Sequence, residues 1–198
     1  MMNYPDFFNI LPKITLQDSL ADFLGTFEDG IVEFSYLDIV KSAGHSCPTV
    51  AGAYLLTLIA LQKLYPNELP KRGEIEVFFK ENQFEGVAGV IANVVTHITG
   101  ATYKNGFKGI SGKFDRTNLL FFNAPITSSI KFERKDTKQS IELIYDISEI
   151  ATDPKIPYFM KQMIQGIATK EDQKLFGVLW QKRVHDIFVN IDKVILIV

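Results

Sequence analysis

Hydrophobic residues recur at helical spacing along much of the chain. This pattern predicts a helix over residues 15–25 with Thr15 as its N-terminal cap, and a second helix over residues 33–43 that ends at Gly44. Residues 48–64 are apolar on nearly every face, so we predict a buried helix there. Further helices are predicted over residues 86–99, 157–165 and 170–189.

Alternating apolar and polar positions predict strands between these helices. The clearest is residues 74–79, and three more are predicted over residues 119–122, 128–134 and 141–145. Short connections favour antiparallel pairing for these three. An apolar segment, residues 194–198, predicts a terminal strand, and residues 1–14 are predicted to form an irregular arm with exposed aromatic rings.

The mixed order of elements predicts an α+β fold. We expect a single core domain, residues 33–198, with a mainly antiparallel sheet packed against buried helices and a long C-terminal helix. Residues 1–32 are expected to form an N-terminal arm and helix that precede this core.

Composition and charge exclude several classes of protein. The chain has 198 residues, of which 46% are hydrophobic, and a net charge of −2, so it lacks the basic excess of a nucleic-acid-binding protein. The longest apolar run, residues 50–61, is too short to span a membrane. A single cysteine excludes an internal disulfide and fits a reducing compartment. Because the N-terminus does not resemble a signal peptide, we expect a cytoplasmic protein.

The single cysteine lies in the segment with the most chemical potential. Cys47 precedes Pro48, a residue suited to the first turn of a helix, and either Ser46 or Cys47 is expected to cap that helix. A helix N-terminus favours the thiolate form of a cysteine there. His45 lies two residues earlier. Imidazole and thiolate together suit zinc, or the imidazole could serve as a base for a nucleophilic thiolate. Cys47 could also be a packed thiol with no chemical role.

At this point the chain resembles a known family. GHSCPTVAGAYLL, residues 44–56, is similar to the Gly-His-x-Cys-Pro signature of the FmdE-like family, which is named after formylmethanofuran dehydrogenase. GVIANVVTHITGATYKNG, residues 89–106, resembles a second block of that family, a helix followed by a glycine-rich loop. Gly112–Lys113 and the long helix from Ala168 are looser similarities. The resemblance covers about residues 33–190.

The chain also departs from the family pattern. Thr49 replaces a glycine, Ala101 replaces the second cysteine, Asn93 stands where an aspartate is common, and the zinc-ribbon tail of some members is missing. The resemblance implies an α+β core, an intertwined dimer in many members, and a metal near the His-x-Cys motif in some.

Other residues could complete a site near this motif. His97 could join His45 and Cys47 as a third ligand for a divalent transition metal, most simply zinc. Asn93 lies one helical turn before His97, and Thr102 and Lys104 follow the glycine turn, so these three are candidates for binding a cofactor or small ligand. His185 is expected to be a solvated or interface residue.

These observations lead to two main functional hypotheses. The first is a metal-binding FmdE-like domain with a redox or metal-linked enzymatic role, in which Cys47 and His45 act at the reacting centre. The alternative is a non-catalytic accessory or sensing module that binds a small molecule or a partner protein in the same cleft. A thiol-based transferase is a third, weaker hypothesis. Apolar residues near both termini, among them Phe7, Phe8, Phe188 and Ile195, predict a homodimer.

Overall fold

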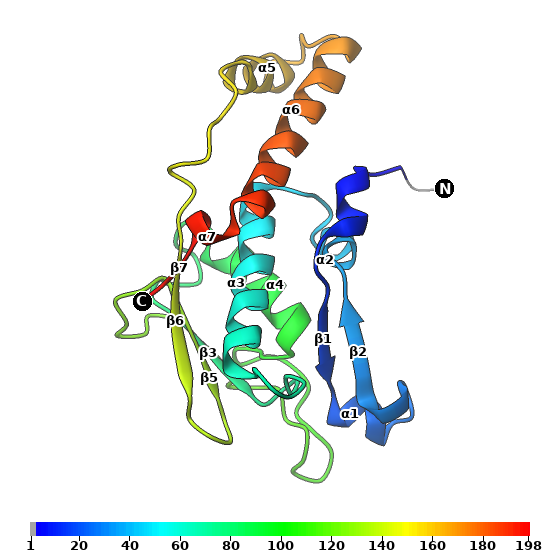
Figure 1. Cartoon of the computed structure of the whole chain (residues 1–198), viewed down its shortest axis with the longest axis vertical. Coiled ribbons are helices and arrows are strands. Elements are labelled where there is room, and N and C mark those ends of the chain that lie inside the picture. Colours follow the sequence, from blue (N-terminus) through cyan, green and yellow to red (C-terminus); the bar gives the residue numbers. More distant parts are fainter. Residues whose placement is uncertain (1–2) are drawn as a thin grey trace.

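A computed structural model of the chain describes residues 3–198, and within this range the strands form two sheets. The larger has five strands in the order β4-β3-β5-β6-β7, and the smaller is the antiparallel hairpin β1-β2 (Figure 1). The strands are β1 (Ile14–Gln17), β2 (Ile31–Phe34), β3 (Ile75–Phe79), β4 (Leu120–Phe121), β5 (Ile130–Arg134), β6 (Ser140–Tyr145) and β7 (Ile195–Ile197). The predicted α+β class with a mainly antiparallel sheet is confirmed.

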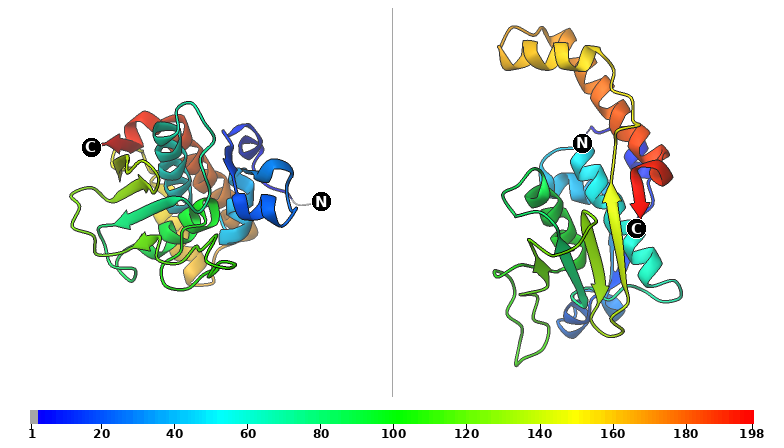
Figure 2. Two further views of the ribbon diagram at one scale, coloured as in Figure 1. Left: turned by 90° about the horizontal axis from the view of Figure 1, so that it is seen from below. Right: turned by 90° about the vertical axis from the view of Figure 1, so that its left-hand side faces the viewer.

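Helices occupy the space between the two sheets. Figure 2 shows α3 and α4 between the five-stranded sheet on one side and the β1-β2 hairpin on the other. The α-helices are α1 (Ser19–Phe23), α2 (Tyr36–Ala43), α3 (Pro48–Leu64), α4 (Ala88–Thr99), α5 (Lys155–Ile164), α6 (Lys170–Val189) and α7 (Ile191–Val194). Two short 3-10 turns are η1 (Asp6–Ile10) and η2 (Glu28–Gly30).

The central helix α3 has the bounds that the sequence predicts. It begins at Pro48 and ends at Leu64, and nearly all of its side chains are buried. Burial on every face explains why its apolar residues show no amphipathic pattern. Gly52 permits close packing, because a Cβ atom at this position would collide with the ring of Tyr145 on β6.

The N-terminal predictions were partly wrong. Thr15 does not cap a helix, because residues 14–17 form strand β1, which pairs with β2. The helix begins only at Ser19, where the Asp18 side chain accepts hydrogen bonds from the Leu20 and Ala21 amides. The preceding arm is also less exposed than predicted, since it contains η1 and buries Phe8 in the core. Strand β2 begins at residue 31, so the expected boundary after residue 32 falls inside the hairpin.

One strand direction was also wrong. β4 runs parallel to β3, whereas β5, β6 and β7 pair antiparallel along the rest of the sheet. The segment between β3 and β4 contains α4, and a helical crossover is the connection that parallel neighbours require.

Helices α5 and α6 form an arm that projects from the body. Figure 1 shows the first half of α6 rising beyond the sheets, with α5 packed against its end. The predicted cap is confirmed, since Thr169 and Asp172 form a reciprocal capping box at the start of α6. Within residues 3–198, no helix combines the length and apolarity needed to cross a bilayer.

Candidate functional site

The His45-Ser46-Cys47 turn joins α2 to α3. Gly44 ends α2 in the left-handed conformation with φ of 77°, which glycine adopts without a steric penalty. Cys47 then caps α3, with its Sγ accepting a hydrogen bond from the Val50 amide at 3.4 Å. The prediction of a capping residue at this turn is therefore confirmed, with Cys47 in that role.

Helix α6 holds this turn in place. The Trp180 Nε1–H donates to the Ser46 carbonyl oxygen at 3.0 Å, and Gln181 Nε2 donates to the same oxygen at 3.4 Å. The Ser46 hydroxyl donates to Gln181 Oε1 at 3.0 Å. The Tyr36 hydroxyl lies 3.0 Å from Ser46 Oγ, on the side of α2. The motif is thus fixed by contacts more than a hundred residues away in sequence.

His45 and His97 line the same pocket. The pocket has a volume of about 230 Å³ and lies between α2 and α4, with Ser42, Val90 and Asn93 also in its wall. His45 Nδ1 lies 3.0 Å from the Ala43 carbonyl oxygen. Because a carbonyl only accepts hydrogen bonds, Nδ1 carries the hydrogen, and Nε2 of the neutral ring has the free lone pair.

His97 is held in a similar way. Its Nδ1 lies 3.3 Å from the Ser42 hydroxyl, and its ring packs edge-on against Phe34 with 5.4 Å between centroids. Burial and the positive charge of Arg72 lower the pKa of His97 below its ordinary value, against the opposing charge of Asp38. His97 therefore favours the neutral form, which is the form that binds metal ions.

A buried ion cluster positions the end of α4 that bears His97. Arg72 donates to the carbonyl oxygens of His97 at 3.0 Å and Ile98 at 2.9 Å, and to Asp18 at 2.8 Å. Arg116 donates to the other Asp18 oxygen at 2.6 Å. The cluster links the hairpin side of the protein to the C-terminus of α4, where positive charge is favourable.

Cys47 does not line the pocket that His45 and His97 share. Its side chain packs against the core near Tyr36 and Tyr145, and the Tyr145 hydroxyl donates to the Pro48 carbonyl oxygen at 2.6 Å. Across residues 3–198, no three or more His, Cys, Asp or Glu side chains gather closely enough to hold a metal ion. The structure of one chain therefore brings two of the three predicted ligands together.

Two of the three predicted ligand-binding residues line a second, larger pocket. This pocket has a volume of about 610 Å³ and is lined by both Asn93 and Thr102. Asn93 and Val90 belong to the walls of both pockets, so the two are adjacent across α4. Lys104 is outside both walls, and its Nζ lies 5.2 Å from the centre of the Tyr103 ring.

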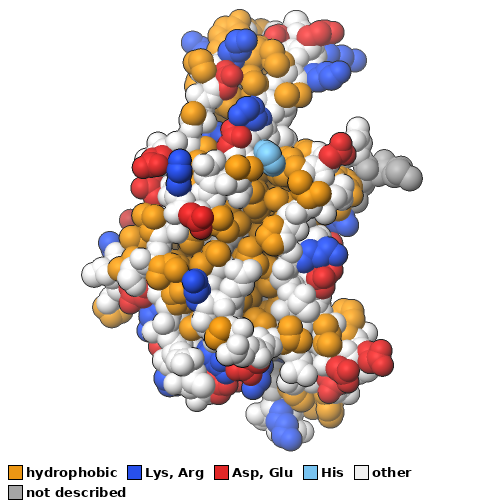
Figure 3. Space-filling view, viewed as in Figure 1, with side chains coloured by type: hydrophobic (Ala, Val, Ile, Leu, Met, Phe, Trp, Pro, Cys, Tyr) orange, Lys and Arg blue, Asp and Glu red, His pale blue; other side chains and the backbone are white. Residues whose placement is uncertain are grey.

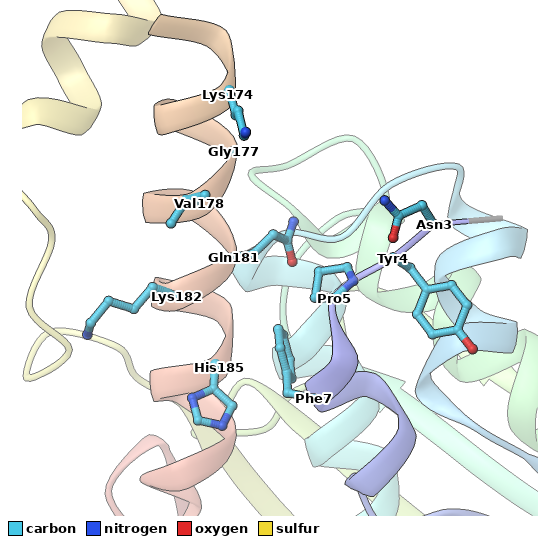
Figure 4. Close-up of a pocket in the computed structure, with 10 residues that line it drawn as sticks. All are labelled: Asn3, Tyr4, Pro5, Phe7, Lys174, Gly177, Val178, Gln181, Lys182 and His185. Atoms are coloured by element: carbon cyan, nitrogen blue, oxygen red, sulfur yellow. The ribbon is translucent and has the colours of Figure 1, made fainter. Parts of the chain in front are cut away.

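The third histidine lies elsewhere. Figure 4 shows His185 on α6 at one end of a groove between that helix and the N-terminal arm. Its ring packs against Phe7 with 4.9 Å between centroids. His185 is therefore well placed as a control for experiments on His45 and His97.

Sequence reasoning missed several residues that shape the site. Ser42 and Arg72 contact His97, and both lie outside the blocks that resemble the family. Trp180 and Gln181 contact Ser46 and lie on the long helix from Ala168, which is one of the looser similarities, but they were not proposed as site residues. Trp180 offered a usable signal, because it is the only tryptophan and a partly buried indole N–H usually finds an acceptor.

Comparison with known proteins gives one clear result. Residues 43–196 match the model of a family described as FmdE, molybdenum formylmethanofuran dehydrogenase operon. A search of curated proteins found no match. The matched segment includes α3, α4 and the α5–α6 arm, and it contains every residue that lines the larger pocket. In the histidine pocket it contains all lining residues except Ile39 and Ser42 of α2. Because the match covers most of the chain, the protein belongs to the FmdE family.

Proposed function

We propose that the protein binds a divalent transition metal, most simply zinc, through His45 and His97. The observation that carries this proposal is the pocket that both imidazoles line, with each Nδ1 within hydrogen-bonding distance of a protein oxygen. Such contacts orient metal-binding histidines, and an Nδ1 that donates its hydrogen, as in His45, leaves Nε2 for the metal. Two ligands are too few for a stable zinc site, so the third comes from Cys47, after a shift of its turn, or from a second copy of the chain.

The bound metal would act as a Lewis acid or lower the pKa of a water molecule. The residues around the metal would orient its ligands and contact a bound molecule. Ser42 and the Ala43 carbonyl orient the two rings, and Asn93 offers an amide at the pocket wall for a bound ligand. The burial of His97 keeps it neutral at physiological pH.

Metal content of the purified protein tests this proposal directly. Protein prepared without chelator should contain a transition metal, and His45→Gln and His97→Gln should each weaken zinc binding by about tenfold or more. His185→Gln is the matched control, because it removes the remaining histidine outside the pocket. A metal-free wild-type protein that also fails to bind added zinc, or an equal loss in His185→Gln, would reject the proposal.

Cys47→Ser then identifies the third ligand. Serine caps helices well, so the variant should fold with nearly unchanged stability. Loss of zinc in this variant assigns Cys47 as a ligand. Retention of zinc assigns the third position to another residue.

One observation favours the alternative of an accessory or sensing module. Cys47 Sγ already accepts the hydrogen bond from Val50, and its side chain packs against the core. In this case, the thiol of metal-free protein should react slowly with iodoacetamide below pH 7. Rapid alkylation there would instead indicate a stabilised thiolate.

We also propose that the protein forms a homodimer through the α5–α6 arm. The arm exposes apolar side chains: Tyr158, Ile164, Ile167, Leu175 and Val178 are 41–81% exposed. Figure 3 shows such side chains among charged ones along the projecting arm. Phe8, Phe188 and Ile195, from which the sequence predicted a homodimer, are instead buried in the core of the chain itself.

Light scattering tests the dimer. Val178→Asp should convert a dimer at micromolar concentration into a monomer, because it places a charge in the apolar surface. Val90→Asp is no suitable control, since it lies in the pocket walls. Thr137→Asp on the exposed β5–β6 turn should leave the mass unchanged. A wild-type monomer would exclude this interface.

A further inference from the structure

The larger pocket differs in chemistry from the histidine pocket. Its volume of about 610 Å³ lies within the range of small-molecule sites. It is bounded by the loop before α4, by α4 itself, by the segment after Gly100 and by the end of β4. Among the described residues that line it, none carries a formal charge. A ligand that depends on ionic contacts therefore has no counter-charge in this wall.

Neutral hydrogen-bonding groups are concentrated in this wall. Three side-chain carboxamides, from Gln83, Asn93 and Asn105, each offer both a donor and an acceptor. The hydroxyls of Thr96 and Thr102 add to this set. The Thr102 hydroxyl donates to the Arg116 carbonyl oxygen at 2.6 Å, so it remains available only as an acceptor.

Aromatic rings form the rest of the wall. Tyr103 packs edge-on against Phe122 with 5.6 Å between centroids, and Phe122 stacks on Phe79 at 5.2 Å. These contacts make a fixed apolar surface. Phe84, by contrast, is 88% exposed on the loop at the pocket, so its ring can cover a bound molecule at little cost. Flat rings and neutral amides together recognise planar molecules with polar edges.

We propose that this pocket binds an uncharged planar heterocycle of nucleobase size, held between aromatic rings and side-chain amides. The proposal goes beyond metal binding and does not depend on it, because Phe84, Thr96, Thr102 and Tyr103 lie outside the wall of the histidine pocket. Asn93 belongs to both walls, so the heterocycle would lie beside the two imidazoles.

Binding of adenosine, guanosine and lumichrome, measured by titration calorimetry in the presence of EDTA, tests this inference. At least one should bind with Kd of about 1 mM or tighter. Phe84→Ala and Asn105→Ala change exposed residues and should weaken that binding by about tenfold each. Phe107→Ala is the matched control, because this exposed phenylalanine follows the same segment without lining the pocket. Failure of all three probes to bind, or binding insensitive to both pocket variants, overturns the proposal.

Comparison of adenosine with AMP separates the pocket from the nearby lysines. Lys104, Lys108 and Lys113 lie close together in sequence and could attract a phosphate on their own. Since no charged residue lines the described pocket wall, AMP should bind no more tightly than adenosine. AMP binding that is tighter by about tenfold, and that is lost in Lys108→Ala, would place recognition on the lysines and reject the proposal. Because EDTA removes free metal, a positive result stands even if zinc binding fails.

Discussion

Replacing Asp18 with asparagine should destabilise the protein strongly. The Asp18 side chain is only 6% exposed and neutralises Arg72 and Arg116 through contacts of 2.8 and 2.6 Å. Asparagine can still cap α1, but it removes the negative charge and leaves two guanidinium groups without a counter-charge. Loss of one partner from a buried ion pair costs about 3–5 kcal/mol. Because Arg72 is 24% exposed and partly solvated, we expect a loss of about 3 kcal/mol.

Urea unfolding followed by circular dichroism measures this loss. With a slope of about 2 kcal/mol per M, the midpoint should fall by about 1.5 M. Glu33→Gln is the control, because the Lys13–Glu33 pair is also close, at 2.6 Å, but both side chains are about half exposed. Solvent screens that pair, so its loss should shift the midpoint far less. Equal midpoint shifts in the two variants would refute our account of the buried cluster.

The pH dependence of the same experiment provides a second check. Burial acts to raise the pKa of Asp18, but the hydrogen bond from Arg72 and the charges of both arginines outweigh it and lower the pKa below its ordinary 3.8. A carboxyl whose pKa is lower in the folded state stabilises the protein above the unfolded pKa, and this stability is lost as the pH falls below it. The difference between wild type and Asp18→Asn should therefore be full at pH 6 and shrink below about pH 4.

Three further variants test packing and titration. Gly52→Ala should lower the free energy of unfolding by about 1–3 kcal/mol in thermal melts, because the Tyr145 ring that it meets is held by its hydroxyl and cannot easily move. Tyr54→Phe removes the hydrogen bond from the hydroxyl to the Pro12 carbonyl oxygen at 2.6 Å and should cost about 1–3 kcal/mol, and unchanged stability would contradict that role. The pKa of His97 is lower in the folded protein than in the unfolded chain, so below pH 6.5 the unfolded chain binds a proton more readily and the wild type loses stability. In EDTA, His97→Gln should remove this loss and make the free energy of unfolding less sensitive to pH below 6.5.

Much of the fold follows from local signals in the sequence. Pro48 marks the start of α3, and Gly44 and Gly100 end α2 and α4 in the left-handed conformation, as their positions predict. These signals are reliable because each depends on the backbone of one residue.

Predictions that depended on distant pairing were less successful. Residues 14–17 alternate between buried and more exposed positions, yet this run is too short to outweigh the helical spacing that continues to Leu24. Its strand character comes from pairing with residues 31–34. The parallel direction of β4 could have been predicted, since the helix between it and β3 already indicates a crossover.

In the candidate site, too, local spacing was predicted correctly, whereas an arrangement that depends on distant contacts was not. Sequence spacing placed Asn93 and His97 on one face of α4, and both line the pocket with His45. The separation of Cys47 from that pocket could not be predicted, because it depends on how Trp180 and Gln181 of α6 hold Ser46. Residues two apart in a turn can face different parts of a protein, and only tertiary contacts decide which.

The arginine that joins the hairpin to α4 has a practical consequence for fragment design. The segment shared with the family begins at residue 43, but Asp18 and the carbonyl acceptors for Tyr54 all precede it. A shortened version starting at residue 43 would leave Arg72 and Arg116 without their carboxylate partner and would uncover one side of the central helix. The smallest fragment that folds by itself should therefore be longer than the segment that matches the family. Expression of residues 43–196 alone should yield insoluble protein.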